Sequence, residues 1–365
     1  MAIVFAPTEL PLAIAGVAYT SPPLLVSGGV APYTWVLLDS EPTGFGFLVD
    51  QTGESGQLVS NLLGVEGPNV IRIRITDADL EVVQVSVSWT VLPTGSVIHD
   101  FGVGDVGARP HENGGGLIAL TATVAPTAYV AATAVVFGTA SVLNSAAVYG
   151  TAQVYGSSTV KDSAQIYGAG QVYDQAEVSG DAIISGSSQV YDSAEINGSA
   201  LVSGFSRVYG SAELTNQVVI TENASVFGTA IVSGNARLFG TTRAFEDAEI
   251  SGAAQISGTA QISGTAQLSQ EAKVFGAAIV RDNARVSGAA TICETAIVRD
   301  SALVHGQAKV AGTAVVSDTA IIRGAAIIRG NARVNSTSIV QGRAIIEGNA
   351  EVTGATVEGD TTINS

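Results

Sequence analysis

The sequence of 365 residues predicts an all-β protein, in which a β-sandwich is followed by a parallel β-helix. Short runs within the first 95 residues alternate between apolar and polar side chains, as the strands of a sandwich do. From Ile118 to Val352 an aliphatic residue then recurs at every sixth position without an insertion, and a small residue precedes it by two places. Such a strict repeat is typical of a solenoid, whose units are stable only when stacked.

The composition of the chain changes after its first third. Every proline lies at or before Pro126, and both tryptophans, Trp35 and Trp89, lie within the first hundred residues. Between the two regions lies a glycine-rich stretch, which we expect to cross to the first coil of the solenoid and cover it. The sequence therefore predicts a sandwich over residues 1–95, a connector and N-terminal cap over 96–117, and a β-helix over 118–365.

The first region contains strand and turn signals at short intervals. Val70–Thr76 and Val83–Val91 alternate apolar with polar residues, and turn residues such as Ser21-Pro-Pro separate the runs. About seven short strands in this length favour a sandwich. The stretches Gly28–Trp35 and Gln51–Gly56 resemble Ig-like modules of bacterial surface and phage proteins. The resemblance implies a role in attachment or spacing.

Each six-residue unit repeats one pattern of side chains. The aliphatic residue points inward and its two neighbours in the strand point outward. Two positions later stands a residue that tolerates positive φ, such as Gly150, Gly156 or Asp162. This pattern resembles the hexapeptide repeat of left-handed parallel β-helices, and the resemblance implies triangular coils of about 18 residues. The units then predict about 13 coils and a rod of about 60 Å.

A second period of eighteen residues appears among the outward positions. It places one aromatic residue in each of seven successive coils: Phe137, Tyr155, Tyr173, Tyr191, Tyr209, Phe227 and Phe245. Two interpretations stay open. The rings could stack only to stabilise the coil, or they could form a contact stripe for a neighbouring chain, a capsid or tail surface, or a sugar ring.

The repeat contains three irregularities. Ala244 replaces an inward aliphatic residue and Val218 replaces an inward small residue, so each predicts a local weak point rather than an active site. Val352 and Val357 are five residues apart, which shifts the register near the end. Either the shifted coil closes the end of the β-helix or something else covers it, and we favour contact with another chain.

The chain is acidic, with a net charge of −16 and a pI of about 4.4. Such a surface repels phosphate backbones, which argues against nucleic-acid binding. We expect no membrane insertion and no signal peptide, because no apolar run is long enough to span a bilayer and no basic segment precedes the first apolar residues. Cys293 is the one cysteine, so no internal disulfide can form.

Groups that could perform catalysis are scarce. Many proteins of the resembled family are acyltransferases that use a histidine base and loops that interrupt the coils. This repeat has one histidine, His305, on its outer face and no such loop. A related carbonic-anhydrase branch needs three histidines on one metal, whereas His99 and His111 lie in the connector. The sequence predicts no enzyme.

Three further sequence features could suggest a cofactor, a nucleophile or a metal site, but none fits the pattern that such a site requires. Gly102–Gly107 fits the string G-x-G-x-x-G, but Ala108-Arg-Pro follows it where a dinucleotide-binding fold needs a helix. Cys293 is predicted to face outward and has no histidine neighbour. Several polar connector residues match no metal-ligand spacing: His99, Asp100, Asp105, His111 and Glu112. We expect no catalytic residue, no cofactor and no metal.

The leading expectation is a non-enzymatic structural protein, specifically a phage virion component such as a fibre, appendage or decoration protein. The sandwich would anchor it and the β-helix would serve as a rigid rod. Its partners would be other virion or scaffold proteins, further copies of the chain (a trimer included) or a glycan, and it would be made in the host cytoplasm. The alternatives are a bacterial cell-surface or scaffold adhesin and, third, a hexapeptide acyltransferase.

Overall fold

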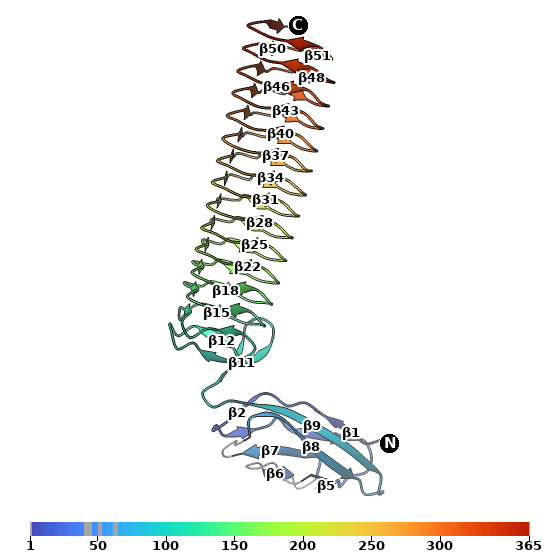
Figure 1. The fold of residues 1–365 in the computed structure, drawn as a ribbon. Helices are drawn as coiled ribbons and strands as arrows, with labels where there is room; N and C mark the ends of the chain where they lie inside the picture. Colours follow the sequence, from blue (N-terminus) through green and yellow to red (C-terminus); the bar gives the residue numbers. More distant parts are fainter. Residues whose placement is uncertain (1, 40–45, 50–52, 61–64, 365) are drawn as a thin grey trace. The chain divides into compact units, whose positions relative to one another are not determined.

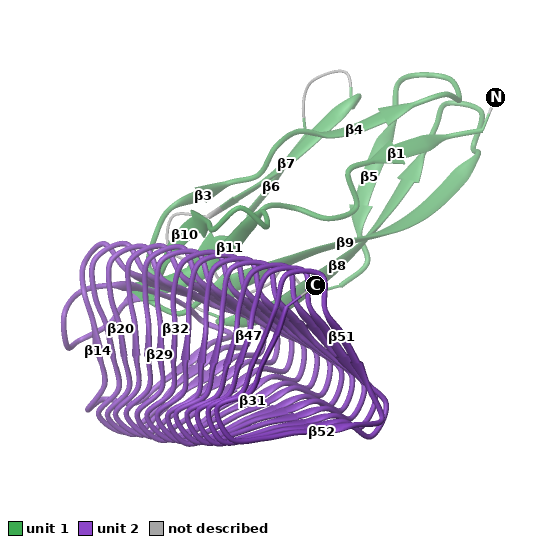
Figure 2. Ribbon diagram, turned by 90° about the horizontal axis from the view of Figure 1, so that it is seen from above, with its two compact units in different colours: residues 1–109 green, residues 110–365 purple. Residues whose placement is uncertain are grey.

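The computed structural model describes residues 2–39, 46–49, 53–60 and 65–364. The chain forms two compact units, residues 1–109 and 110–365 (Figure 2). All secondary-structure elements within the described residues are β-strands, so the predicted all-β class is confirmed. The division between the units falls after Arg109, inside the segment predicted as the connector.

The first unit contains two sheets with a shared core. One sheet has the order β1-β4-β7-β3, with β6 paired to β7; these strands span Val4–Ala6, Leu24–Ser27, Ser55–Ser60, Tyr19–Thr20 and Gly46–Val49. The other has the order β2-β9-β8-β5, whose strands span Ala13–Ile14, Val82–Leu92, Gly67–Thr76 and Thr34–Leu37. Leu24 and Leu58 from the first sheet and Ile73 and Trp89 from the second belong to one buried cluster. The predicted sandwich is confirmed.

Part of the predicted connector has regular structure that the sequence did not indicate. Strands β10 (Val97–Asp100) and β11 (Asp105–Pro110) form an antiparallel hairpin. The Asp100 carboxylate closes its turn by accepting hydrogen bonds from the Gly102 and Gly104 N–H groups at 2.7 and 2.9 Å. The glycines therefore serve a tight turn rather than a flexible linker.

The residues that follow lie against the first coil of the second unit. The Gly116 N–H donates to the Val130 carbonyl at 2.9 Å, and the Val130 N–H donates to the Asn113 carbonyl at 3.1 Å. The Asn113 side-chain amide donates to the Ala128 carbonyl at 2.9 Å. These bonds satisfy edge groups that an uncovered first coil would expose.

The second unit is a three-sided parallel β-solenoid (Figure 1). Face 1 holds every third strand from β12 (Leu117–Ala119) to β51 (Glu351–Thr353). Face 2 runs from β13 (Thr123–Val124) to β52 (Thr356–Val357), and face 3 from β14 (Tyr129–Val130) to β53 (Thr362–Asn364). Faces 2 and 3 have 14 strands each, one more than the approximate number of coils predicted. Most strands are two residues long.

The period of eighteen residues is the register of the solenoid. Gln153 pairs with Gln171 and Val154 with Val172, and on face 1 this offset continues to the fourteenth coil. The predicted slip appears in the last coil, where Val340 pairs with Val357, seventeen residues on. The corner before it is therefore one residue shorter, and the strands stay paired.

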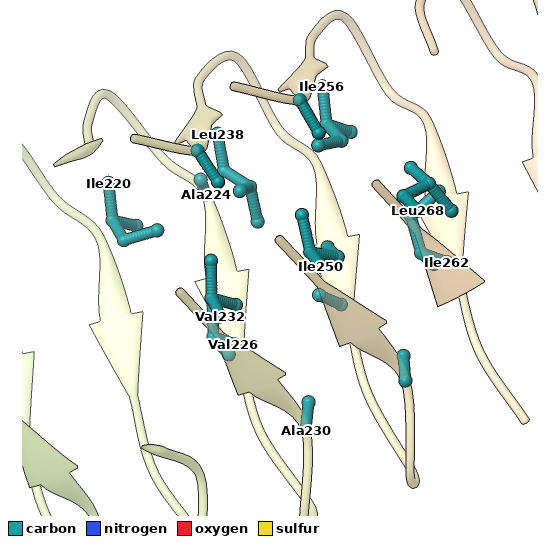
Figure 3. Close-up of a cluster of buried hydrophobic side chains, with 14 of the residues drawn as sticks. Ile220, Ala224, Val226, Ala230, Val232, Leu238, Ile250, Ile256, Ile262 and Leu268 are labelled. Carbon is teal, nitrogen blue, oxygen red and sulfur yellow. The ribbon is translucent and has the colours of Figure 1, made fainter. Parts of the chain in front are cut away.

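The core of the solenoid is a continuous column of aliphatic side chains with small residues at the corners. Figure 3 shows Ile220, Leu238 and Ile256 stacked along face 3, each 0% exposed. Each coil buries the inward side chains of the next, so a single coil has no core of its own. This arrangement explains why the aliphatic repeat tolerates no interruption.

The corners need positive φ, and many use a carboxylate where glycine would also serve. Asp162, Asp192 and Asp318 have φ of 61°, 57° and 57°. Each accepts a hydrogen bond from the backbone N–H of the corner residue one coil on, at 3.1, 3.0 and 2.7 Å. Where the corner is Gly198, an added Cβ would lie 2.7 Å from the Asn216 nitrogen. The coils thus leave little room at this glycine corner, and the acidic corners add a side-chain bond between coils.

The coils are regular at Ala244 and Val218, the two positions predicted as weak points. Ala244 and Val218 are both 0% exposed, and Ala244 pairs normally with Val226 and Ile262. Thr242, in the same unit as Ala244, places a larger side chain at the inward small position and so replaces part of the missing volume. Its buried hydroxyl has no hydrogen-bond partner among the described residues.

Replacing Thr242 by valine is expected to stabilise the solenoid. Thr242→Val keeps the volume and removes an unsatisfied buried hydroxyl, so the free energy of unfolding should rise by about 1–3 kcal/mol. Urea denaturation would measure it. The matched control is Ser188→Ala, because the Ser188 hydroxyl donates to the Ser185 carbonyl at 2.7 Å and its removal should destabilise by about 1 kcal/mol. A loss of stability in Thr242→Val would contradict the conclusion that the Thr242 hydroxyl is buried without a hydrogen bond.

Candidate interaction surfaces

The seven predicted aromatic residues form one stack along face 1. Successive ring centroids are 4.8, 4.8, 4.9, 4.9, 4.8 and 5.1 Å apart, and no two neighbouring planes differ by more than 4°. Each ring belongs to the residue directly after a face 1 strand, from β15 (Val135–Val136) to β33 (Arg243–Ala244). The sequence thus located every member of the column correctly.

Stacking decides which part of each ring meets the surroundings. Phe137 is 8% exposed and the other six rings are half-buried, because each ring covers the face of the next. The column therefore presents ring edges. A sugar that stacks on an aromatic residue needs a free ring face, and the faces within this column are already in contact with one another.

Burial also affects the tyrosine hydroxyls. Desolvation raises the pKa of Tyr155 and Tyr191, and it raises the pKa of Tyr173 to about 12, with the neighbouring tyrosines adding to the effect. Water stabilises a phenolate better than the flanking rings do. Tyr155, Tyr173 and Tyr191 are therefore neutral at physiological pH.

A ladder of glutamine side chains accompanies the rings on face 1. The Gln171 amide donates to the Gln153 side-chain oxygen at 3.3 Å, and the Gln189 amide donates to that of Gln171 at 2.8 Å. Identical amides in register can bond from coil to coil along the whole run. Two neighbouring columns on this face thus connect successive coils.

A second, shorter aromatic stack lies on face 3 and was missed at the sequence level. Tyr149 and Tyr167 have centroids 4.7 Å apart and planes 6° apart, while Tyr129 meets Tyr149 at 5.0 Å and 34°. Tyr149 and Tyr167 keep the period of eighteen residues, which could have revealed them. Tyr129 precedes its inward residue rather than following it, and so falls outside a count of one position per unit.

Exposed apolar side chains occur singly farther along the solenoid. Phe205 is 69% exposed at a corner, and Phe239 and Phe275 are 37% and 40% exposed on face 3. These phenylalanines are not members of the face 1 column. Isolated apolar residues of this kind are normal on protein surfaces.

The chemically reactive candidates do not come together. No three His, Cys, Asp or Glu side chains of the described residues are placed to hold a metal ion. His99 packs its ring against Phe101 at 4.5 Å, and the His111 Nδ1 lies 3.1 Å from the Asn113 carbonyl oxygen. Gly102–Gly107 forms the turn of the β10–β11 hairpin and the start of β11, and no helix follows it among the described residues.

Cys293 faces outward but is not accessible. The thiol stands on the outer side of face 3, but the residue is only 2% exposed, in a column between Phe275 and Ala311. Burial raises the pKa of the thiol. A buried thiol with a raised pKa is a poor nucleophile. The thiol faces outward as predicted, and it is buried because its neighbours in the column cover it.

The described part of the chain includes no helix with the length and apolar character required to cross a bilayer.

Comparison with known proteins gives a likeness to solved structures only. No protein-family model matches the chain, and no curated protein matches it. The BIgI domain of β protein from S. agalactiae bound to CEACAM1 is 10% identical, with a TM-score of 0.21; the match covers 26% of this chain and 99% of that one.

Two titin structures match to a similar degree. A chimeric titin Z1Z2 carrying an exogenous decorin peptide is 13% identical, with a TM-score of 0.20, over 26% of this chain and 96% of that one. The titin M3 domain is 12% identical, with a TM-score of 0.20, over 25% and 96%. Likenesses of this size carry no argument about activity or partners.

Proposed function

We propose that this protein is a non-enzymatic structural protein, in which the solenoid is a rigid rod and the sandwich is an attachment module. One observation carries the proposal. Fourteen coils follow one another with no inserted loop, and an aromatic column and a glutamine ladder on face 1 join one coil to the next. Enzymes on similar scaffolds need loops and a positioned base, and a regular ladder supplies neither.

Within this class we propose a phage virion component, such as a fibre, an appendage or a decoration protein. The support is the pairing of a long solenoid with a sandwich whose sequence resembles Ig-like modules of phage and bacterial surface proteins. Its partners would be other virion or scaffold proteins and further copies of itself. The acidic surface disfavours nucleic acid as a partner.

Two other functions are compatible with some of the same residues. A bacterial cell-surface or scaffold adhesin would use the rod and the sandwich in the same way. An acyltransferase would require His305 as its base, and the strands before and after this residue, β43 (Leu303–Val304) and β44 (Lys309–Val310), follow the regular repeat without a loop that could form a cleft.

The location of the chain tests the proposal. Particles released by lysis would be purified and probed with an antibody against residues 1–109. We expect the chain to co-sediment with virions and the antibody to label them. Recovery only in the envelope fraction of uninfected cells would favour the adhesin. Transfer of acyl groups from a coenzyme-linked donor, abolished by His305→Ala, would contradict the structural role altogether.

A further inference from the structure

Charge is distributed unevenly around the solenoid. On face 2 the first residue of the strand is a glutamate in four coils: Glu177, Glu195, Glu213 and Glu249. On face 3 the outward positions of the described strands hold a single carboxylate, Glu347, which accepts a hydrogen bond from the Arg329 Nε at 2.7 Å. Face 3 carries cations instead. Face 1 likewise has a single carboxylate at its outward strand positions, Glu351, so the acidic strand residues of the coils are concentrated on face 2.

The cations of face 3 follow a regular spacing. Arg237, Lys273 and Lys309 are the first residues of β32 (Arg237–Leu238), β38 (Lys273–Val274) and β44. They are 36 residues apart, which is two coils, or about 10 Å along the solenoid. All three are exposed, and none makes an ion pair with any described residue.

Three glutamates of face 2 have the same spacing. Glu177, Glu213 and Glu249 are the first residues of β22 (Glu177–Val178), β28 (Glu213–Leu214) and β34 (Glu249–Ile250), again 36 residues apart. Glu213 and Glu249 are exposed, and Glu177 is bonded to Lys161 at 2.7 Å. The register sets Glu195 directly between Glu177 and Glu213, and like charges in direct register destabilise a sheet.

We propose that copies of this protein associate side by side, with face 2 of one copy on face 3 of the next and a stagger of three coils. The three glutamates lie in the fourth, sixth and eighth coils, and the three cations in the seventh, ninth and eleventh. A shift of three coils therefore brings all three glutamates level with the three cations of a second copy. The spacings agree because both copies have the same backbone repeat.

The positions between these pairs are compatible with the contact. In the same stagger Glu195 comes level with Gln255 and Ile231 with Thr291, so no like charges meet. Two acidic chains otherwise repel each other, and complementary sides allow them to approach. A second copy is favoured over another polyanion because its carboxylates match the cations in both number and spacing.

The stagger also determines the type of assembly. A contact between two different faces closes into a ring only if no shift along the axis accompanies the rotation. A shift of three coils excludes a closed trimer through this contact and gives an open, stepped array. The inference does not depend on the function proposed above, because a monomeric chain could still be a structural rod.

Sedimentation velocity of the full chain tests the contact. At low ionic strength the wild type should form species larger than a monomer, and about 1 M salt, which shortens the Debye length to about 3 Å, should disperse them. Glu213→Lys and Lys273→Glu should each weaken association at least ~10-fold, because like charges then meet at the central pair. Circular dichroism would show that both variants are folded.

Mixing the two variants makes the test specific. A mixture of Glu213→Lys with Lys273→Glu should associate as the wild type does, because each variant then finds an opposite charge on the other. The matched control is Glu195→Lys, one coil from Glu213, which should associate normally because it faces Gln255. A monomeric wild type, a mixture that stays dispersed, or equal loss in Glu195→Lys would overturn the proposal. So would a Lys273-dependent retention on heparin by a chain that does not self-associate.

Discussion

A chain lacking residues 307–324 is expected to fold into the same solenoid with one coil fewer. These eighteen residues are one complete coil, and their removal joins Gly306 to Ala325, which occupies the same place in its own unit as Gln307. Leu303, which pairs with Ile321, would then pair with Ile339. The free energy of unfolding should fall by about one fourteenth, the share of one coil among 14.

Removing half as many residues should have a far larger effect. Without residues 307–315, Gly306 joins Val316, and the pattern beyond it is displaced by half a unit. Arg323 and Arg329 would then occupy inward positions, and Ile321 would occupy a corner that needs positive φ. An unpaired buried charge and a β-branched residue at positive φ are each strongly destabilising.

Limited proteolysis with mass spectrometry distinguishes the two deletions. The variant without 307–324 should resist protease to its C-terminus, as the full chain does. The variant without 307–315 should be digested back to about residue 306 while the coils before it survive, because each coil contacts only its neighbours. Equal resistance of both variants would show that the phase of the repeat does not control folding.

Replacing Tyr155, Tyr173 and Tyr191 together by serine is expected to lower stability without unfolding the chain. The change removes four of the six stacked contacts in the column. At about 0.5–1.5 kcal/mol for each aromatic pair, the loss should be about 2–6 kcal/mol. The inward side chains Val154, Val172 and Val190 are unchanged, so the coils should stay formed. Chemical denaturation would measure the loss.

The same variant separates the two interpretations of the column. Self-association measured by sedimentation should be unaffected, because the rings present only edges on face 1 and the proposed contact uses faces 2 and 3. The control Gln153→Ser with Gln171→Ser and Gln189→Ser alters the adjacent column on the same face and should cost less stability. Loss of association in the tyrosine variant alone would identify the column as an interface.

Much of this fold could be predicted because solenoid contacts are local in a simple sense. Each residue contacts the residues eighteen positions before and after it. Counting along the sequence therefore predicts which side chains are neighbours on the surface. Tyr155 and Tyr173 were placed in one line on that basis, and the slip between Val352 and Val357 was located correctly.

Other features could not be predicted from the repeat, because they depend on backbone groups and on the packing of neighbouring side chains. The bonds from corner carboxylates run to backbone N–H groups of the next coil, which have no signal in the sequence. The β10–β11 hairpin was hidden because its turn is rich in glycine and its strands are short. Exposure of an outward residue depends on the bulk of its neighbours in the column, which is why the burial of Cys293 was missed.

The uniform coil has a consequence for how such a rod changes length. Each coil adds about the same rise, because every strand of the solenoid pairs with the strand one coil on. Recombination between neighbouring repeats in the gene would add or remove eighteen codons at a time and leave both ends of the protein intact. The length of the solenoid can therefore change in steps of one coil while the sequences at its two ends stay the same.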